Sequence, residues 1–282
     1  MRPDEEIINR WRGVAEFWDK HRDIIRGMFA PVTQALIEDA GIETHDSVLD
    51  VATGPGEPAL SVAALAGPKG KVFGVDPIQG MVTAARAEAK RLGLKNAKFD
   101  VALADDLPFA ADTFDAVISR FGVMFFPSPV DGVREMLRVL KPGRKLALAV
   151  WYFAEQNPFH FALSRVIDRY VNAPPLDPEA LDAFRFAPRG KLMEVFSQAG
   201  AVARSERLLQ FTIDAPVSVE DFWNLRREMS EKLNEKFEML SADQQPKVQQ
   251  EILSSLREYS TGNVMSFPAE VLIVSGAKTT PA

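Results

Sequence analysis

A glycine loop and the acidic residue that follows it carry the clearest chemistry in the chain. Asp50 lies near the end of a short apolar segment, and Gly54 and Gly56 follow that segment in a loop that runs into a helical pattern near Pro58. Glycines let a backbone approach a ligand closely, and the first turn of a helix offers free N–H groups. Asp76 ends the next apolar segment, and its carboxylate can accept two hydrogen bonds from a ribose diol. This spacing predicts a nucleoside or dinucleotide site, with a ligand-free turn as the alternative.

The other residues of the loop favour a cationic ligand over a dinucleotide. The dinucleotide fingerprint G-x-G-x-x-G needs a third small residue, and Ala59 can fill that place. Glu57, however, adds a negative charge beside the position of a pyrophosphate. The chain also lacks a recognisable Tyr/Lys or His/Asp arrangement for hydride transfer. A nicotinamide-dependent oxidoreductase is therefore the weaker interpretation.

Three histidines and one arginine are candidates for acid–base or anion chemistry. His160 lies in a segment that should face the active site, and His21 lies three residues after Trp18. His45 precedes the first strand, near the wrong end of a parallel sheet. Arg120 follows the fourth strand and is interpreted either as an anion-binding residue or as half of a salt bridge. The histidines lack metal-ligand spacing, so we expect no metal.

Alternating strands and helices must position these residues. Helical patterns run from Ile78 to Leu92 and from Val130 to Leu140, between strand-like segments. Leu146–Val150 is apolar on both faces, as a strand covered by helices requires. The alternation predicts a Rossmann-like, doubly wound α/β fold with a mostly parallel, seven-stranded sheet and helices on both faces. The strands are expected at Ser47–Val51, Lys71–Val75, Lys98–Val101, Phe114–Ser119, Lys145–Val150, Ser205–Ile213 and Ala269–Val274.

The pattern changes on both sides of a core at residues 47–152. Residues 1–46 form an N-terminal region in which Ile7–Gly41 is predicted to form two helices. Its Trp11, Phe17 and Trp18 belong either to a lid over the ligand site or to a helix packed on the core. Residues 153–282 are predicted to complete the sheet, with insertions at about 153–188 and 216–262 that form a helical cap. The second insertion is rich in paired charges, and a homodimer through this cap is an open alternative.

Composition excludes several classes of function. The chain has 282 residues, a net charge of −6 and no cysteine. An acidic chain is a poor candidate for nucleic-acid binding, and a chain without cysteine has no disulfides, thiolate nucleophiles or cysteine-ligated metals. The first residues lack the apolar core of a signal peptide, and no apolar stretch is long enough to span a membrane. We therefore expect a cytoplasmic protein without a membrane span.

Four motifs stand in order along the core. They are D-V-A-T-G-P-G at 50–56, G-V-D-P-I-Q-G-M at 74–81, L-P-F-A-A-D-T-F-D-A-V at 107–117 and E-M-L-R-V-L-K-P-G at 135–143. Together they resemble the class I S-adenosylmethionine-dependent methyltransferases, in particular the branch that includes the ubiquinone/menaquinone C-methyltransferases. The resemblance is strong over about residues 40–152 and loose in the flanks.

The resemblance implies S-adenosylmethionine as the cofactor, S-adenosylhomocysteine as the product and a small-molecule methyl acceptor. The loop at 50–56 would hold the methionine end of the cofactor, and Asp76 would hold the ribose hydroxyls. Residues after the second and third strands would contact the adenine. The implied cofactor-binding residues are Asp50, Ala52, Thr53, Gly54, Gly56, Asp76, Pro77, Met81, Ala104, Asp105, Ser119, Arg120, Phe121 and Trp18.

The sequence departs from the family pattern at three places. The first glycine of the loop motif is Ala52, which this branch tolerates. The acid that commonly accepts a hydrogen bond from the adenine amino group aligns with Leu103, so Asp105 or Asp106 replaces it or the bond is missing. An Arg-Asn pair of the quinone C-methyltransferases aligns with Met124-Phe125, which argues against quinone methylation.

Aromatic and apolar residues after the fourth strand and in the two insertions predict an acceptor pocket, with core packing as the alternative. The predicted pocket residues are Met124, Phe125, Phe159 and Trp223, and the candidate catalytic residues are His160, His21 and Arg120. Methyl transfer by in-line displacement to an O, N or C nucleophile is the leading hypothesis. A non-catalytic protein that binds the cofactor, or that works through its helical cap, is the second.

Overall fold

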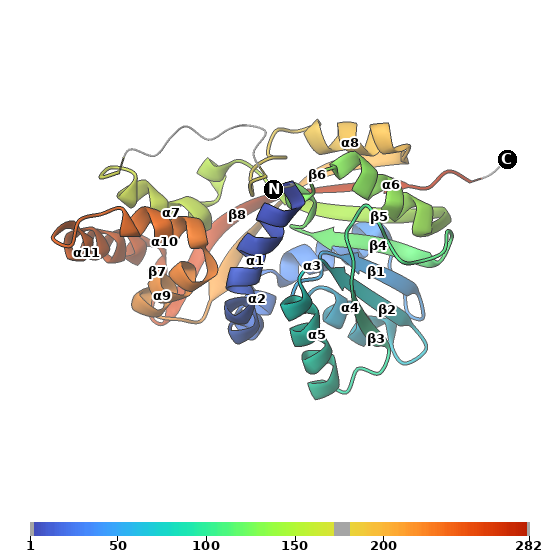
Figure 1. Cartoon of the computed structure of the whole chain (residues 1–282), viewed down its shortest axis with the longest axis horizontal. Helices are drawn as coiled ribbons and strands as arrows, with labels where there is room; N and C mark the ends of the chain where they lie inside the picture. Colours follow the sequence, from blue (N-terminus) through green and yellow to red (C-terminus); the bar gives the residue numbers. More distant parts are fainter. Residues whose placement is uncertain (1–2, 172–180, 281–282) are drawn as a thin grey trace.

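A single β-sheet runs through the molecule (Figure 1). The computed structural model describes residues 3–171 and 181–280 of the chain. The strand order is β3-β2-β1-β4-β5-β8-β6, and the short β7 pairs with β8. Strands β3 to β5 run parallel, whereas β8 runs antiparallel to both β5 and β6. The strands are β1 (Ser47–Val51), β2 (Lys71–Asp76), β3 (Ala97–Val101), β4 (Phe114–Arg120), β5 (Leu140–Trp151), β6 (Val202–Ala215), β7 (Ser260–Thr261) and β8 (Val264–Ala277).

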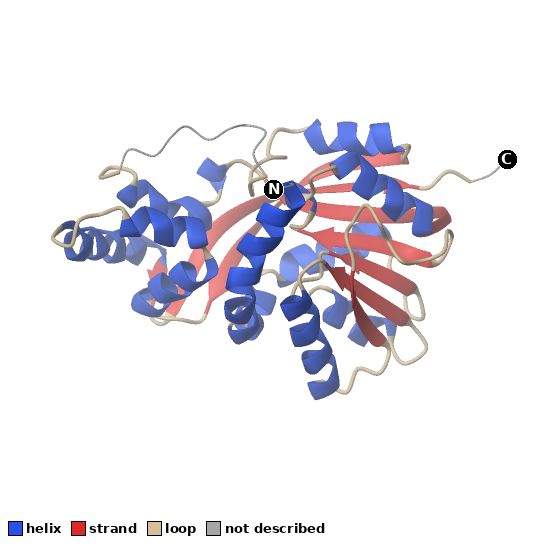
Figure 2. Ribbon diagram, viewed as in Figure 1, coloured by secondary structure: helices blue, strands red, loops and turns tan. Residues whose placement is uncertain are grey.

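The predicted fold class is confirmed, with one correction to the number of strands. The described residues form eight strands rather than seven, because the chain turns back at Gly262 and lets β7 pair with the start of β8. Helices lie on both faces of the sheet (Figure 2). The central strands are buried on both faces as predicted, and Leu146 to Val150 of β5 are fully inaccessible to solvent, whereas the edge strands β3 and β6 are partly exposed.

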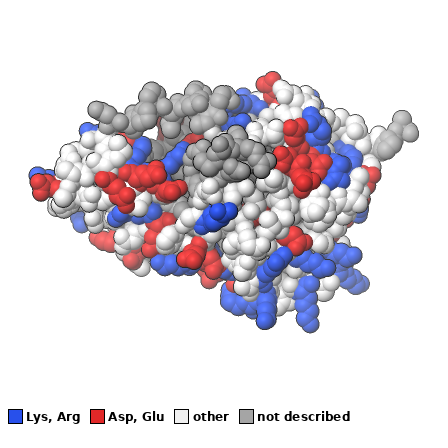
Figure 3. All heavy atoms as spheres, viewed as in Figure 1, with Lys and Arg blue, Asp and Glu red and all other residues white. Residues whose placement is uncertain are grey.

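Three helices connect the parallel strands, and one more packs beside β6. Helices α4 (Ala59–Ala66) and α5 (Gln79–Arg91) pack on β2 and β3, and α6 (Pro129–Val139) packs on β5 and on α8 (Lys191–Ala199). Exposed lysine and arginine side chains gather over α5 and the loop after it (Figure 3). Two of the arginines in this region pair with acids, Arg86 with Asp100 and Arg91 with Glu88.

The N-terminal segment forms three helices rather than the two predicted. Helices α1 (Pro3–Lys20), α2 (Arg22–Met28) and α3 (Ala30–Ala40) are separated at His21 and Phe29, whose ψ angles of 13° depart from helical geometry. Helix α3 packs on β4 and β5 inside the core. Helix α1 instead contacts α5 on one side and the cap helix α9 on the other, so it crosses the middle of the molecule in Figure 1.

A group of helices forms a cap beside the long ends of β6 and β8. It consists of α7 (Pro158–Ile167), α9 (Val219–Met229), α10 (Glu231–Glu238) and α11 (Gln244–Leu256). Ser230 follows the last residue of α9, has extended backbone and caps α10 by accepting a hydrogen bond from Leu233 N. Fully buried Phe159, Phe222 and Phe267 join the cap to the sheet. In the described part of the chain, no helix is long and apolar enough to cross a membrane.

Candidate functional site

A cavity of about 460 Å³ lies at the carboxyl ends of the parallel strands. Its volume is within the range of small-molecule sites, and its place is where open α/β sheets bind ligands. The ends of β1, β2, β4 and β5 form one side of the cavity, and residues of α1, α2, α7 and α9 form the other. The insertions and the N-terminal helices therefore close a crevice that the sheet alone would leave open.

Asp50 holds the loop after β1 in place through hydrogen bonds to both of its ends. Asp50 Oδ2 accepts hydrogen bonds from Thr53 Oγ1 (2.6 Å) and from Ala59 N (3.1 Å). The carboxyl group is fully buried and does not line the cavity, and its burial raises the pKa of Asp50 to about 7. Ala52, Thr53 and Gly54 do line the cavity. Asp50 thus fixes the shape of the loop whose backbone faces the ligand.

Gly56 serves the turn rather than the ligand. It has a φ of 115°, and a Cβ there would lie 2.6 Å from Leu60 Cδ1. Gly56 does not line the cavity. The two glycines that predicted a ligand loop therefore have different roles. Gly54 lines the cavity, whereas Gly56 allows the chain to pass close to Leu60 as it enters α4.

Asp76 presents its carboxylate to the cavity from the end of β2. Its Oδ2 accepts a hydrogen bond from Gly54 N and its Oδ1 accepts one from Ile78 N, both at 2.9 Å. Each oxygen therefore keeps acceptor capacity for a ligand hydroxyl. Burial raises the pKa of Asp76 to about 6. The two backbone bonds hold the carboxylate in place and tie the β1 loop to β2.

The predicted adenine residues also lie along the cavity. Pro77, Met81, Ala104 and Asp105 line it, and so does Leu103. Asp106 does not line the cavity. Of the two acids that could replace the family's adenine-contacting residue, only Asp105 faces the cavity.

Helix α1 covers this end of the cavity with two tryptophans. Trp11 and Trp18 line the cavity with their ring centroids 5.7 Å apart, and Trp11 packs edge-on against Phe125 at 5.2 Å. Lys20 and His21 hold the end of α1 on the cap through Glu228 at 2.9 and 2.7 Å. His21, a predicted catalytic candidate, therefore pairs with an acid of α9 and does not line the cavity.

The end of β4 marks the middle of the cavity. Ser119 is fully buried and does not line it, whereas Arg120 and Phe121 do. Arg120 donates a hydrogen bond to Thr33 Oγ1 at 2.8 Å. Phe121 has a φ of 64°, which bulky residues rarely adopt. This conformation accompanies a parallel stack of its ring on Trp151, with centroids 4.4 Å apart and planes at 4°.

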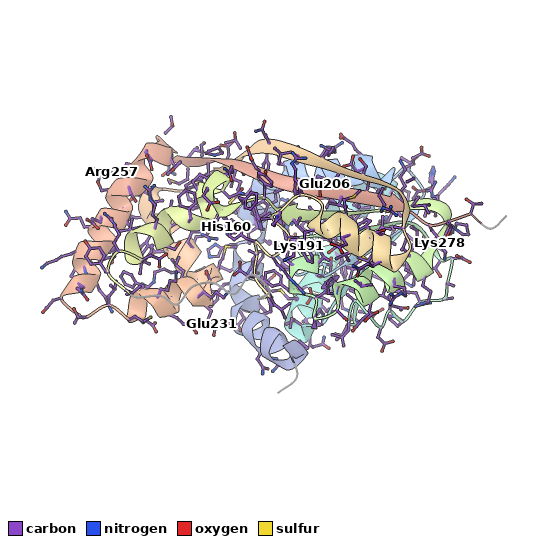
Figure 4. The ribbon with its side chains drawn as sticks, turned by 90° about the horizontal axis from the view of Figure 1, so that it is seen from above. His160, Lys191, Glu206, Glu231, Arg257 and Lys278 are labelled. Atoms are coloured by element: carbon purple, nitrogen blue, oxygen red, sulfur yellow. The ribbon has the colours of Figure 1, made fainter. Side chains whose placement is uncertain are left out.

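Beyond Phe121 the cavity has aromatic walls, which we call the acceptor chamber. Trp151 meets His160 edge-on at 4.3 Å, and His160 meets Phe159 at 5.2 Å. Burial and the nearby Arg226 charge hold the pKa of His160 well below its usual value, so its imidazole is neutral. His160 Nε2 is buried and has no hydrogen-bond partner among the described residues. Figure 4 shows His160 on α7. The chamber is lined by Phe29, Phe121, Trp151, Phe159, His160 and Arg226.

Three of the four predicted pocket residues line the cavity, and the fourth does not. Met124, Phe125 and Phe159 line it. Trp223 is buried on another side of α9, against Phe237 at 5.2 Å. Trp151 and Arg226 also line the cavity and were not predicted from the sequence. Trp151 stands at the carboxyl end of a predicted strand, which is a usable signal, whereas no local pattern marks Arg226.

The fold is the Rossmann-like fold that the motifs predicted, with a cavity at the carboxyl ends of its parallel strands. Residues 48–143 match a family model described as a methyltransferase domain. This match covers about a third of the chain, and over these residues the chain is similar to methyltransferase domains.

One curated relative and two solved structures show what the chain resembles in sequence and in fold. The ubiquinone/menaquinone biosynthesis C-methyltransferase of Pseudomonas fluorescens (strain SBW25) is 33% identical over 168 residues, which are 59% of this chain and 64% of that protein. The match thus spans slightly less than two thirds of this curated relative. A putative methyltransferase from Bacillus halodurans C-125 has a similar fold, with a TM-score of 0.57, 21% identity, and coverage of 88% of this chain and 99% of that chain. Phosphoethanolamine N-methyltransferase 2 of Haemonchus contortus, solved with S-adenosyl-L-methionine, has a TM-score of 0.55 at 16% identity and coverage of 93% and 57%.

Proposed function

We propose that the protein is an S-adenosylmethionine-dependent methyltransferase that acts on a small, partly apolar acceptor. One observation carries the proposal: a single cavity joins the Asp76 and Gly54 side of the sheet to the acceptor chamber. The methyltransferase domain match and a similarly folded protein solved with this cofactor support it. We also propose the division into a lid at 1–46, a cofactor-binding core at 47–152, and a region at 153–282 whose insertions supply acceptor-binding residues.

The residues at the strand ends fit the chemical groups of this cofactor. Asp76 keeps acceptor capacity for the ribose diol, and Met81 and Pro77 offer an apolar surface to the adenine. Asp105 would accept a hydrogen bond from the adenine amino group. Glu57 lines the cavity on the side where the methionine end would lie, and its charge and that of the buried Asp50 act on Arg120.

When bound, S-adenosylmethionine supplies a methyl group on a sulfonium whose leaving group is a neutral thioether, so the chain has to orient the acceptor and exclude water. The Phe121–Trp151 stack and Phe159 give the acceptor flat apolar walls. Trp11 and Trp18 cover the opposite end from α1. His160 is the one predicted base that lies in the chamber. Its neutral imidazole could take the proton of a hydroxyl or amine nucleophile.

Replacing His160 with Gln is expected to lower kcat about 10²- to 10⁴-fold for a hydroxyl acceptor, the usual contribution of a general base. Gln keeps a polar side chain of similar length. The affinity for S-adenosylhomocysteine should stay within about twofold, because His160 lies in the chamber beyond Phe121. An unchanged kcat would show that His160 only shapes the chamber.

The proposed function is tested by titrating the full chain with S-adenosylmethionine, S-adenosylhomocysteine, NADH and NADPH in a calorimeter. We expect micromolar binding of the first two and no binding of the others. Phenols, amines and carbon acids can then be screened as acceptors by the S-adenosylhomocysteine they release. Binding of a nicotinamide alone would contradict the proposal and favour an oxidoreductase. Binding of none would redirect attention to protein partners of the cap.

A further inference from the structure

Arg226 is a buried cation in the wall of the acceptor chamber, and it has no anionic partner among the described residues. It lies on α9, is 7% exposed and lines the cavity. Its Nε is buried without a hydrogen-bond partner, and no acid of the described residues forms an ion pair with its guanidinium. The guanidinium makes a cation–π contact with Phe159, whose ring centroid lies 4.3 Å from Arg226 Cζ.

The other cations that line the cavity have partners within the chain. Arg22 pairs with Glu88 at 2.9 Å, Arg26 with Asp23 at 3.0 Å, and Lys232 with Asp182 at 2.9 Å. Arg120 donates to Thr33 Oγ1. Within the part of the chain that the structure describes, Arg226 is the cavity-lining cation that has neither an ion pair nor a side-chain hydrogen bond.

A buried charge without an anionic partner destabilises the folded chain. The stability of the fold therefore does not explain why an arginine occupies this position. Burial alone lowers the pKa of Arg226, to about 10, and the guanidinium is still charged near pH 7. An apolar side chain of similar volume would avoid this desolvation penalty. The position of the charge is therefore better explained by a ligand that supplies the missing anion.

The surroundings of Arg226 indicate the shape of that ligand. Its guanidinium lies over the flat face of Phe159, and the neighbouring His160 packs on Trp151. Trp151 in turn is parallel to Phe121 at the end of β4. A planar apolar body would fit among these rings, with its anionic end at Arg226 and its opposite end toward the strand ends.

We propose that Arg226 binds the carboxylate of a planar, aromatic methyl acceptor. The planar guanidinium presents paired N–H donors that match the two oxygens of a carboxylate. This assignment rests on the proposed function, because it names the acceptor class for the same site. It makes Arg226 a specificity-determining residue and leaves the methyl-accepting atom at the other end of the molecule.

A bound carboxylate would also change the neighbouring imidazole. The charge of Arg226 contributes to the low pKa of His160, after burial. An anion on Arg226 offsets that charge, so the pKa of His160 rises when the acceptor binds. His160 would then be a stronger base with the correct acceptor in place than without it.

The test uses benzoate and its neutral analogue benzamide as probes, titrated into the full chain with and without saturating S-adenosylhomocysteine. We expect benzoate to bind wild type at least tenfold more tightly than benzamide. Arg226→Met should remove this preference, and Arg226→Lys should restore part of it because a charge returns without the fork of donors. Arg227→Met is the matched control on the same helix, since Arg227 bonds Asn234 and packs on Trp223 outside the cavity.

The readouts separate this assignment from the proposed function. Arg226→Met should bind S-adenosylhomocysteine within about threefold of wild type and should melt at a temperature no lower than wild type. If wild type fails to bind S-adenosylhomocysteine, the proposed function fails, while the dependence of benzoate binding on Arg226 is still read in the cofactor-free protein. Absent benzoate binding, equal binding of the two probes, or an unchanged preference in Arg226→Met would overturn the assignment.

Discussion

Asp76→Ala is expected to weaken S-adenosylhomocysteine binding by about 1–3 kcal/mol, or roughly 5- to 150-fold. The substitution removes the acceptors for the ribose hydroxyls. It also leaves the N–H groups of Gly54 and Ile78 without their present partner, so the β1 loop loses one of its hydrogen bonds to β2 and keeps the one from Thr53 N to Val75 O. Calorimetry measures the change. An affinity equal to that of wild type would remove Asp76 from the site.

The pH dependence of binding offers a second view of the same carboxylate. Burial raises the pKa of Asp76 to about 6 and that of Asp50 to about 7. The carboxylate form of Asp76 is the better acceptor for two hydroxyls, so affinity should rise with pH through about 6. Asp76→Asn keeps the shape but cannot ionise, and its affinity should lose the step near pH 6 while it keeps any step due to Asp50. Identical profiles for the two proteins would contradict this role.

Gly122→Ala is expected to lower the free energy of unfolding by about 1–3 kcal/mol, the usual range for overpacking. Its φ of −89° and ψ of −47° suit any residue, so the effect arises from space alone. A Cβ there would lie 2.5 Å from Ala52 Cβ and 2.6 Å from Ser119 Oγ. Both neighbours belong to the strand ends that form the cavity. The ligand loop must therefore shift, and cofactor affinity should fall with stability.

Gly27→Ala is the matched control for this substitution. Gly27 lies in α2, and a Cβ there would have no atom within 4 Å. Alanine in an exposed helix should raise the free energy of unfolding by about 0.5–1 kcal/mol. Urea unfolding of both variants gives the comparison. A Gly122→Ala protein as stable as wild type would show that the strand ends adapt without strain.

The fold was predictable where local pattern and burial coincide. The two-sided apolar run at Leu146–Val150 indicated a covered strand, and K-P-G at 141–143 marked the end of a helix that stops at Val139. The extent of β8 was not predictable in the same way. The expected strand began at Ala269, but β8 starts at Val264 and includes Pro268, which pairs opposite Thr212. Proline normally argues against a strand, and here the pairing with β6 outweighs that preference.

The cofactor side of the site was predictable because it is built from short segments at strand ends. Asp76 and Gly54 lie in motifs at the carboxyl ends of strands, and the position of each strand in the sheet determines where these residues lie in the fold. The acceptor side depends on how distant helices pack. Trp223 and Arg226 are three residues apart on α9, and both are buried. Amphipathicity therefore could not show that Arg226, rather than Trp223, faces the chamber.

The most direct measurement is a crystal structure of the full chain with S-adenosylhomocysteine. We predict that the ribose hydroxyls lie on Asp76, the amino-acid end lies at the Ala52–Gly54 loop, and the sulfur faces the acceptor chamber beside Phe121. That arrangement would place the departing methyl group of the cofactor and the acceptor in one cavity. Binding outside this cavity, or with the sulfur turned away from Phe121 and Trp151, would contradict methyl transfer at this site.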